Sequence, residues 1–187
     1  MNKVYTLLLV LLAALFGGNV YGQISMTTTG SYSQDFNTLL TTGSATWTNN
    51  TTIPNWYAAS YNSSYVAEAG AGNSGGLKSY GTGTSTERAL GSLGSGSANP
   101  AYGVVFKNTS GVTITDIKVT YTGEQWRNGG VTATQSLSFY YAKSATSITS
   151  VSAGASGYTA VTALNFTSLI GTTTPAQLDG NAVANRT

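Results

Sequence analysis

The stretch from residue 114 to residue 143 constrains the fold more than any other part of the sequence. Apolar and polar residues alternate over residues 116–121 and again over residues 136–141, and an Asn-Gly-Gly turn lies between them at residues 128–130. A period of two places one face of a strand on a core and the other face in water. Glycine tolerates the positive φ values that tight turns between strands require. The pattern predicts one long β-hairpin against which the rest of the chain packs.

A charged and aromatic cluster interrupts the first arm of this predicted hairpin. Gly123 breaks the alternation and is followed by Glu124, Gln125, Trp126 and Arg127. A glycine inside a strand often marks a bulge that re-aims the side chains after it. We expect Glu124 and Trp126 to point to one side of the chain and their two neighbours to the other, so that the four cannot all contact one ligand. Trp126 is predicted to pack in or over the core.

Composition restricts both the fold class and the chemistry. Only 7 % of the 187 residues are charged, against about 25 % in an average globular protein, and the chain has no His and no Cys. Disulfides, thiolate metal sites, cysteine nucleophiles and the usual general base are therefore excluded. The 41 % hydrophobic fraction, with abundant Tyr, Thr, Ser and Gly, suits strands and turns rather than helix bundles. The sequence predicts an all-β fold.

The spacing of the extended stretches predicts the architecture. About nine short strands separated by Gly, Asn and Ser turns are typical of a β-sandwich. Their uneven lengths and the lack of a repeat argue against a barrel or a β-helix. We predict a single antiparallel, jelly-roll-like β-sandwich over residues 31–187, preceded by a short leader at residues 23–30 and a signal peptide at residues 1–22.

The first 22 residues have the organisation of a secretory signal peptide. Lys3 supplies a basic start, Tyr5–Phe16 is mostly apolar, and a glycine stands before Gln23. The apolar run is shorter than the roughly 20 residues that span a bilayer, so cleavage after Gly22 would leave no membrane span. The predicted location is secreted or at the cell surface.

The net charge left after removal of the signal peptide does not indicate a charged partner. Without Lys3 the chain holds seven basic and six acidic residues, a balance too weak to attract nucleic acid. The glycine-rich stretch at residues 70–76 lacks the GxxxxGK[ST] pattern that cradles phosphates. We therefore expect no nucleic-acid or nucleotide partner.

Several short motifs resemble a known module. They are, in chain order, QDFNTL (34–39), RALGSLGSG (88–96), VFKNTSG (105–111), VTYTGEQWRNG (119–129), LNFTS (164–168) and LDGN (178–181). Together they resemble a jelly-roll-like module, often N-terminal, in large exported bacterial proteins that use C-terminal sorting tails. The resemblance spans roughly residues 32–187 and implies the fold, export, and surface or glycan binding. In that family the module continues past the equivalent of Thr187, so the resemblance implies a C-terminally truncated domain.

Two glutamates are the best candidates for catalysis. Glu87 and Glu124 would suit a glycoside-cleaving pair of carboxylates. Each lies near an arginine, however, and such neighbours more often form structural ion pairs. We predict structural ion pairs among Glu87, Arg88, Glu124 and Arg127. A serine hydrolase would need a histidine that the chain lacks, so the sequence predicts no enzyme.

Carboxylates leave one metal alternative open. A calcium ion bound in a sandwich of this kind would use oxygen ligands from Asp35, Asp116 or Asp179. No clustered Asp motif surrounds any of them. The prediction is that the chain has no cofactor.

The aromatic residues raise a binding alternative. Flat rings can contact sugars while neighbouring polar groups bond the hydroxyls. The candidate ligand-binding residues are Glu124, Trp126, Arg127, Trp56 and Tyr57. The favoured function is a non-catalytic structural or interaction module, and the alternative is a carbohydrate-binding module that contacts glycans or other cell-surface components. Exposure of two tryptophans on one open face would favour the alternative.

Overall fold

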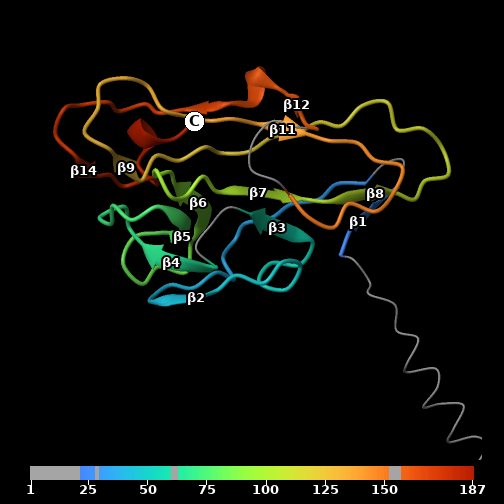
Figure 1. The fold of residues 1–187 in the computed structure, drawn as a ribbon, viewed down its shortest axis with the longest axis horizontal. Helices are drawn as coiled ribbons and strands as arrows, with labels where there is room; N and C mark the ends of the chain where they lie inside the picture. Colours follow the sequence, from blue (N-terminus) through green and yellow to red (C-terminus); the bar gives the residue numbers. More distant parts are fainter. Residues whose placement is uncertain (1–21, 28–29, 60–62, 152–156) are drawn as a thin grey trace, which may run out of the picture.

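The computed structural model describes residues 22–27, 30–59, 63–151 and 157–187, and short strands joined by loops make up nearly all of its regular structure (Figure 1). The all-β class is confirmed. The elements, in chain order, are β1 (Ile24–Met26), β2 (Ser44–Thr46), β3 (Trp56–Ala59), β4 (Ser64–Glu68), β5 (Gly76–Tyr80), β6 (Ala89–Leu93), β7 (Ala101–Val104), β8 (Phe106–Asn108), β9 (Arg127–Asn128), β10 (Ser136–Leu137), β11 (Tyr140–Tyr141), β12 (Thr159–Ala160), η1 (Thr162–Leu164), β13 (Phe166–Thr167), β14 (Ala176–Gln177) and η2 (Val183–Asn185).

The core is built by the first half of the chain. The strands β2-β4-β5-β6 form the largest sheet, and β3 pairs with β7. Side chains from β3, β4, β5 and β6 meet in one buried cluster, which also takes in residues from the loops around β2. Its members are Leu39, Trp47, Ile53, Ala58, Tyr65, Leu77 and Leu90. The aromatic ring of Trp47 meets Tyr65 edge to face at 5.9 Å, a favoured aromatic geometry.

Strand β5 is one of the two inner strands of the four-stranded sheet. All five of its residues are buried, because β4 and β6 cover its two edges and side chains cover its faces. Burial on both faces is typical of a central strand. The pairing is mixed rather than purely antiparallel, since both β4–β5 and β1–β8 are parallel.

The predicted hairpin over residues 114–143 is wrong. Strand β9 pairs with β14, β10 with β13 and β11 with β12, so the paired pieces of this stretch take partners from further along the chain. Residues 114–122, the first arm, lie in no strand. Gly123 likewise exchanges backbone hydrogen bonds with Thr187, at 2.9 and 3.0 Å. Alternation fixes which face of a strand is apolar, but it does not choose the neighbouring strand. In Figure 1 these later segments, yellow to red, lie above the blue and green segments of the core.

The structure describes part of the predicted leader and almost none of the predicted signal peptide. Residues 24–26, expected in a leader, form β1, which pairs with β8, so they belong to the fold. Residues 1–21 of the predicted signal peptide lie outside the described residues. Within the described ranges, no helix has the length and apolar character needed to cross a membrane.

One ion pair lies inside the first half of the fold. Lys78 Nζ is 3.4 Å from a carboxylate oxygen of Glu68, and the two side chains are only 4 % and 13 % exposed. Burial of both charges makes each depend on the other, because neither has water to replace its partner.

This dependence predicts an asymmetric mutational response. Glu68→Ala should lower the free energy of unfolding by about 3–5 kcal/mol, because it leaves the Lys78 ammonium buried without its partner. The double variant Glu68→Leu/Lys78→Met should recover most of that loss, since the buried charge is gone. Denaturant titration measures both values. A loss well below 1 kcal/mol in Glu68→Ala would contradict the buried pair.

Candidate functional site

Trp126 is the centre of the charged and aromatic cluster. Its side chain is 3 % exposed, and its ring stacks on Tyr80 of β5 with centroids 5.8 Å apart and planes within 3°. Gly180 packs so closely that a Cβ there would lie 2.3 Å from the indole nitrogen. The indole N–H donates to Glu124 Oε2 at 2.9 Å. Trp126 is therefore held by protein atoms and offers no open face to a ligand.

The partners of Arg127 are backbone carbonyls. Its Nη1 donates to the carbonyl oxygens of Gly70 and Ala71, at 3.1 and 3.0 Å. Gly70 has φ of +89°, and a Cβ there would lie 1.8 Å from the carbonyl oxygen of Trp126. Only glycine fits such an approach. Arg127 and Trp126 thus join the loop after β4 to the C-terminal part of the chain.

Glu124 lies on the same side of the chain as Trp126, as predicted, and is half-buried. Burial raises the pKa of its carboxyl above the ordinary value. The hydrogen bond from Trp126 opposes this rise, whereas the negative charge of Glu87 adds to it. The principal direct partner of the carboxylate is an indole N–H, so its role in this geometry is that of a hydrogen-bond acceptor.

The predicted structural ion pairs are wrong. Within the described residues, the single ion pair at 4.0 Å or less joins Lys78 and Glu68. Successive residues of a strand point to opposite faces, so sequence neighbours seldom meet. The prediction fails for all four of its members, namely Glu87, Arg88, Glu124 and Arg127.

The side chains of Glu87 and Arg88 point in opposite directions and have different partners. Glu87 Oε2 accepts a hydrogen bond of 2.7 Å from the side-chain amide of Asn181. Arg88 turns inward, where it is 1 % exposed and donates from Nε to Ser79 Oγ at 2.9 Å and from Nη2 to the Ser79 carbonyl. Burial lowers the pKa of Arg88, and the nearby Glu87 charge partly offsets that effect.

Two buried amides that were not among the predicted site residues hold the loop at residues 169–174. Gln125 accepts from the backbone N–H groups of Leu169 and Ile170, at 2.8 and 2.7 Å, and donates to the Ile170 carbonyl at 2.7 Å. Asn128 donates to the carbonyls of Thr172 and Thr174, at 3.2 and 2.8 Å. The sequence could not predict that these two amides are buried, because buried and exposed amides look alike in a sequence.

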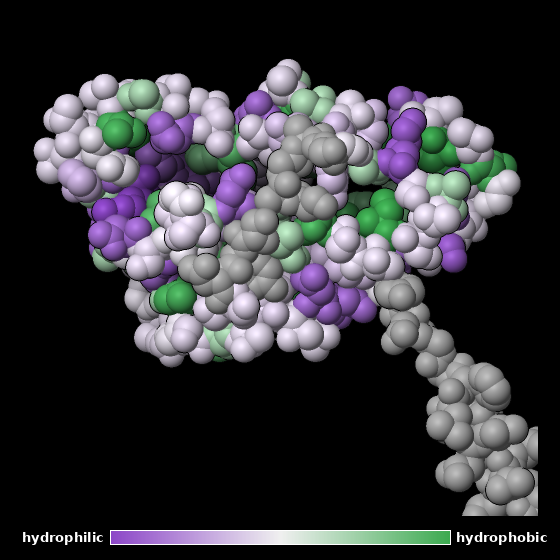
Figure 2. Space-filling view, viewed as in Figure 1, coloured by the Kyte–Doolittle hydropathy of each residue, from purple (hydrophilic) through white to green (hydrophobic). Residues whose placement is uncertain are grey.

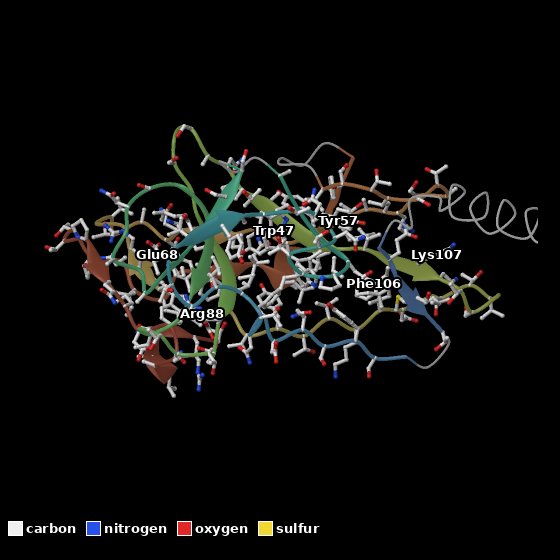
Figure 3. All side chains as sticks on the ribbon, turned by 90° about the horizontal axis from the view of Figure 1, so that it is seen from below. Trp47, Tyr57, Glu68, Arg88, Phe106 and Lys107 are labelled. Carbon is white, nitrogen blue, oxygen red and sulfur yellow. The ribbon has the colours of Figure 1, made fainter. Side chains whose placement is uncertain are left out.

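Trp56 and Tyr57 lie elsewhere, on β3. Tyr57 is buried, and its hydroxyl donates to the Gly22 carbonyl at 2.8 Å. Burial raises the pKa of this phenol. In Figure 3 Tyr57 and Arg88 lie apart along the long axis of the molecule. Since the contacts of Trp126 are with β5 and Gly180, the five predicted ligand-binding residues do not form one site.

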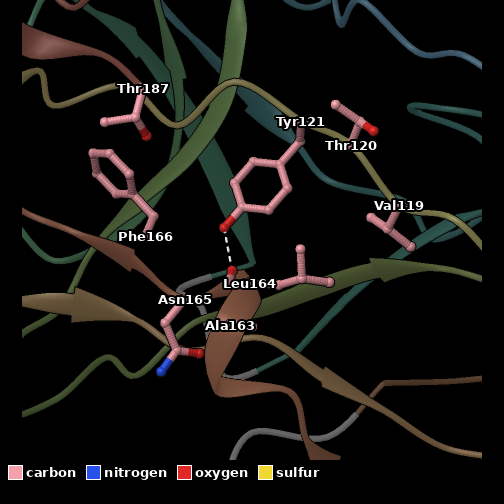
Figure 4. Close-up of a pocket in the computed structure, with 8 residues that line it drawn as sticks. All are labelled: Val119, Thr120, Tyr121, Ala163, Leu164, Asn165, Phe166 and Thr187. Carbon is pink, nitrogen blue, oxygen red and sulfur yellow. Dashed lines mark hydrogen bonds between the residues drawn. The ribbon is translucent and has the colours of Figure 1, made fainter.

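A small pocket lies beyond these residues (Figure 4). It encloses about 230 Å³ and is lined by eight residues, none with a charged side chain. They are Val119, Thr120, Tyr121, Ala163, Leu164, Asn165, Phe166 and Thr187. The hydroxyl of Tyr121 donates to the Leu164 carbonyl across the pocket. Without an acid, a base or a cation in its walls, the pocket supplies only weak polar contacts.

The three aspartates of the calcium alternative have local partners. Asp35 accepts from the backbone N–H of Asn37 at 3.0 Å, and Asp179 accepts from the backbone N–H of Asn181 at 3.0 Å. Asp116 accepts from the neighbouring threonine hydroxyl. In the part of the chain that the structure describes, no three metal-ligating acidic side chains come together.

Comparisons of the chain with family models, with curated proteins and with solved structures find no match. The resemblance of its motifs to the exported jelly-roll-like module therefore stays a prediction. Any function must be argued from the geometry of the described residues.

The contact between Trp126 and Glu124 predicts a contrast between two substitutions. Glu124→Ala leaves a buried indole N–H without an acceptor, which should lower the free energy of unfolding by about 1–3 kcal/mol. Glu124→Gln keeps an acceptor oxygen and should cost much less. Chemical denaturation followed by tryptophan fluorescence measures both. Equal losses in the two variants would mean that the hydrogen bond is not what stabilises this position.

Proposed function

We propose that this chain is a non-catalytic structural or interaction module of an exported bacterial protein. The observation that carries the proposal is the inward orientation of the cluster at residues 124–127. Trp126 is enclosed by Tyr80, Gly180 and Glu124, and Arg127 is bound to backbone carbonyls. Groups committed to protein partners stabilise a fold, whereas a binding site directs them outward.

The positions of the tryptophans support the same function. Trp47 and Trp126 are both buried, and Trp56 is half-buried. Sugar-binding surfaces need flat aromatic faces open to solvent. Two tryptophans on one open face would favour glycan binding, and the burial of Trp47 and Trp126 argues against that arrangement.

The candidate carboxylates support the absence of catalysis. Glycoside hydrolysis needs two carboxyl groups that reach opposite sides of one bond. Glu124 is bonded to Trp126 and Glu87 to Asn181. Moving either carboxylate to a substrate would break a contact that the fold uses.

A panel of polysaccharides tests the non-catalytic function. Incubation of the secreted chain with each polysaccharide should release no more reducing sugar than a protein-free blank. Glu87→Gln and Glu124→Gln are the matched variants, because each keeps the shape and the hydrogen bond while removing the charge. Hydrolysis by the wild type that is lost in both variants would overturn the proposal.

One observation favours the carbohydrate-binding alternative. A row of aromatic rings reaches the surface near β3 and β8, where Tyr32 and Phe106 are 37 % and 36 % exposed. Tyr32 meets Phe106 edge to face at 5.8 Å, and its hydroxyl accepts from Trp56 Nε1 at 2.9 Å. Phe36 continues the row at 4.8 Å from Trp56. Its half-exposed rings suit one side of a sugar, with glycans or other cell-surface components as partners.

A glycan array distinguishes the two functions. The structural module predicts no glycan retained above background. If the aromatic row binds sugar instead, the wild type should bind and Tyr32→Ala should lose that binding. Tyr140→Ala is the control, because Tyr140 is similarly exposed at 39 % but lies on β11, which pairs with β12 rather than with any strand of the aromatic row.

A further inference from the structure

The chain already lies against the fold at Gly22. The hydroxyl of Tyr57 donates to the Gly22 carbonyl at 2.8 Å, and Tyr57 is only 3 % exposed. A Cβ at Gly22 would clash with the side chain of Asn50, so the backbone touches the loop between β2 and β3. The residues that follow form β1, which pairs with β8. The peptide bond between Gly22 and Gln23 is therefore packed onto the fold.

Removal of the predicted signal peptide would cut this peptide bond. Cleavage after Gly22 takes away the carbonyl to which Tyr57 donates, and no other hydrogen bond of this hydroxyl is found among the described residues. Cleavage also leaves an α-amino group on Gln23, which is largely charged at neutral pH. An ammonium group has only donors, so it cannot accept from the Tyr57 hydroxyl. A buried donor without an acceptor is destabilising, so the cleaved chain needs a new acceptor here.

The side chain of Gln23 can supply that acceptor by an intramolecular reaction. The neutral α-amino nitrogen attacks the side-chain amide carbon Cδ and closes a five-membered lactam. The bond from the α-nitrogen to Cδ forms, the Cδ–Nε2 bond breaks, and ammonia leaves with one hydrogen of the α-amino group. The reaction needs no oxidant, reductant or second substrate. Its product is neutral and carries a carbonyl oxygen on the terminal nitrogen.

We propose that the exported chain begins with Gln23 cyclised to pyroglutamate, and that the lactam carbonyl replaces the Gly22 carbonyl as the acceptor for Tyr57. Both carbonyls are bonded to the same nitrogen, so the lactam oxygen stays at the start of β1 and reaches the hydroxyl by a rotation of the terminal residue. The inference goes beyond the proposed function and rests only on its export part, since cleavage after Gly22 precedes ring closure.

Ring closure gives up little that holds Gln23 in place. The Nε2 atom that leaves as ammonia donates to the Ile148 carbonyl at 3.3 Å, which is long for a hydrogen bond. The next residue keeps its own bond, because the Ile24 N–H donates to the Val105 carbonyl at 2.9 Å. The terminus is thus still anchored at β1 after cyclisation.

The surroundings of this terminus favour a neutral group. Strand β1 runs beside β8 with Ile24 opposite Phe106, and Figure 2 shows hydrophobic residues at the surface near β8. A charge next to apolar surface loses part of its hydration, whereas a lactam carries no charge. Cyclisation therefore removes the α-ammonium charge at the place where it is least well solvated.

Intact mass spectrometry of the secreted chain tests the modification. The measured mass should be lower than that of unmodified residues 23–187 by one molecule of ammonia. N-terminal sequencing should be blocked until a pyroglutamyl peptidase removes the first residue. Gln23→Asn is the matched variant, because it keeps a side-chain amide but would need a strained four-membered ring to cyclise. Its mass should equal that of its open chain.

A double-mutant cycle with Tyr57→Phe tests the hydrogen bond to the lactam. In the wild type, Gln23→Asn should lower the Tm by about 2–4 °C, the shift that one ordinary hydrogen bond gives in a chain of this size. In the Tyr57→Phe background the same change should shift the Tm by less than about 1 °C, because the donor is already gone. Equal shifts in the two backgrounds would overturn the assigned hydrogen bond.

The outcomes separate this inference from the proposed function. A secreted chain that begins at Gln23 with its unmodified mass overturns the cyclisation, and a chain that begins at any other residue overturns the assigned terminus. Neither result bears on the polysaccharide panel. Hydrolysis in that panel would overturn the non-catalytic function even if Gln23 were cyclised.

Discussion

The contact of Trp126 with Tyr80 joins the two halves of the structure. Tyr80 ends an inner strand of the four-stranded sheet, whereas Trp126 belongs to the chain that leads to the C-terminal strands. Buried aromatic pairs contribute large apolar areas and a preferred stacking geometry. Glu124, Gly70 and Gly180 fit around the indole ring and its backbone. If this contact were lost, the segments after β8 would keep few buried side chains with which to hold the core sheet.

Those later segments are held largely by polar side chains. The apolar core lies in the first half of the chain, and the C-terminal half relies on buried amides such as Gln125 and Asn128. Buried amides of this kind are specific because each donor and acceptor needs a partner in the right place. Two charged side chains, Lys78 and Arg88, are also buried, although the chain has few charges.

The sequence predicted the fold class and part of the cluster, for reasons that can be separated. The period of two and the composition indicated strands, and the shared side of Glu124 and Trp126 followed from alternation and is confirmed by their hydrogen bond. The hairpin was wrong because alternation does not identify a strand's partner. The buried pair of Lys78 and Glu68 was missed because the parallel register of β4 and β5, which brings these residues together, is a tertiary property.

The central claim is that Trp126 belongs to the interior and does not contact ligands. Native-state hydrogen exchange of the indole N–H groups tests it directly, since the three tryptophans give three separate signals. The account predicts that the Trp126 indole exchanges as slowly as the backbone amides of β5, while Trp56 at the half-exposed aromatic row exchanges faster. Rapid exchange at Trp126 with slow exchange in β5 would contradict it, because the indole would then be open to solvent on a folded core.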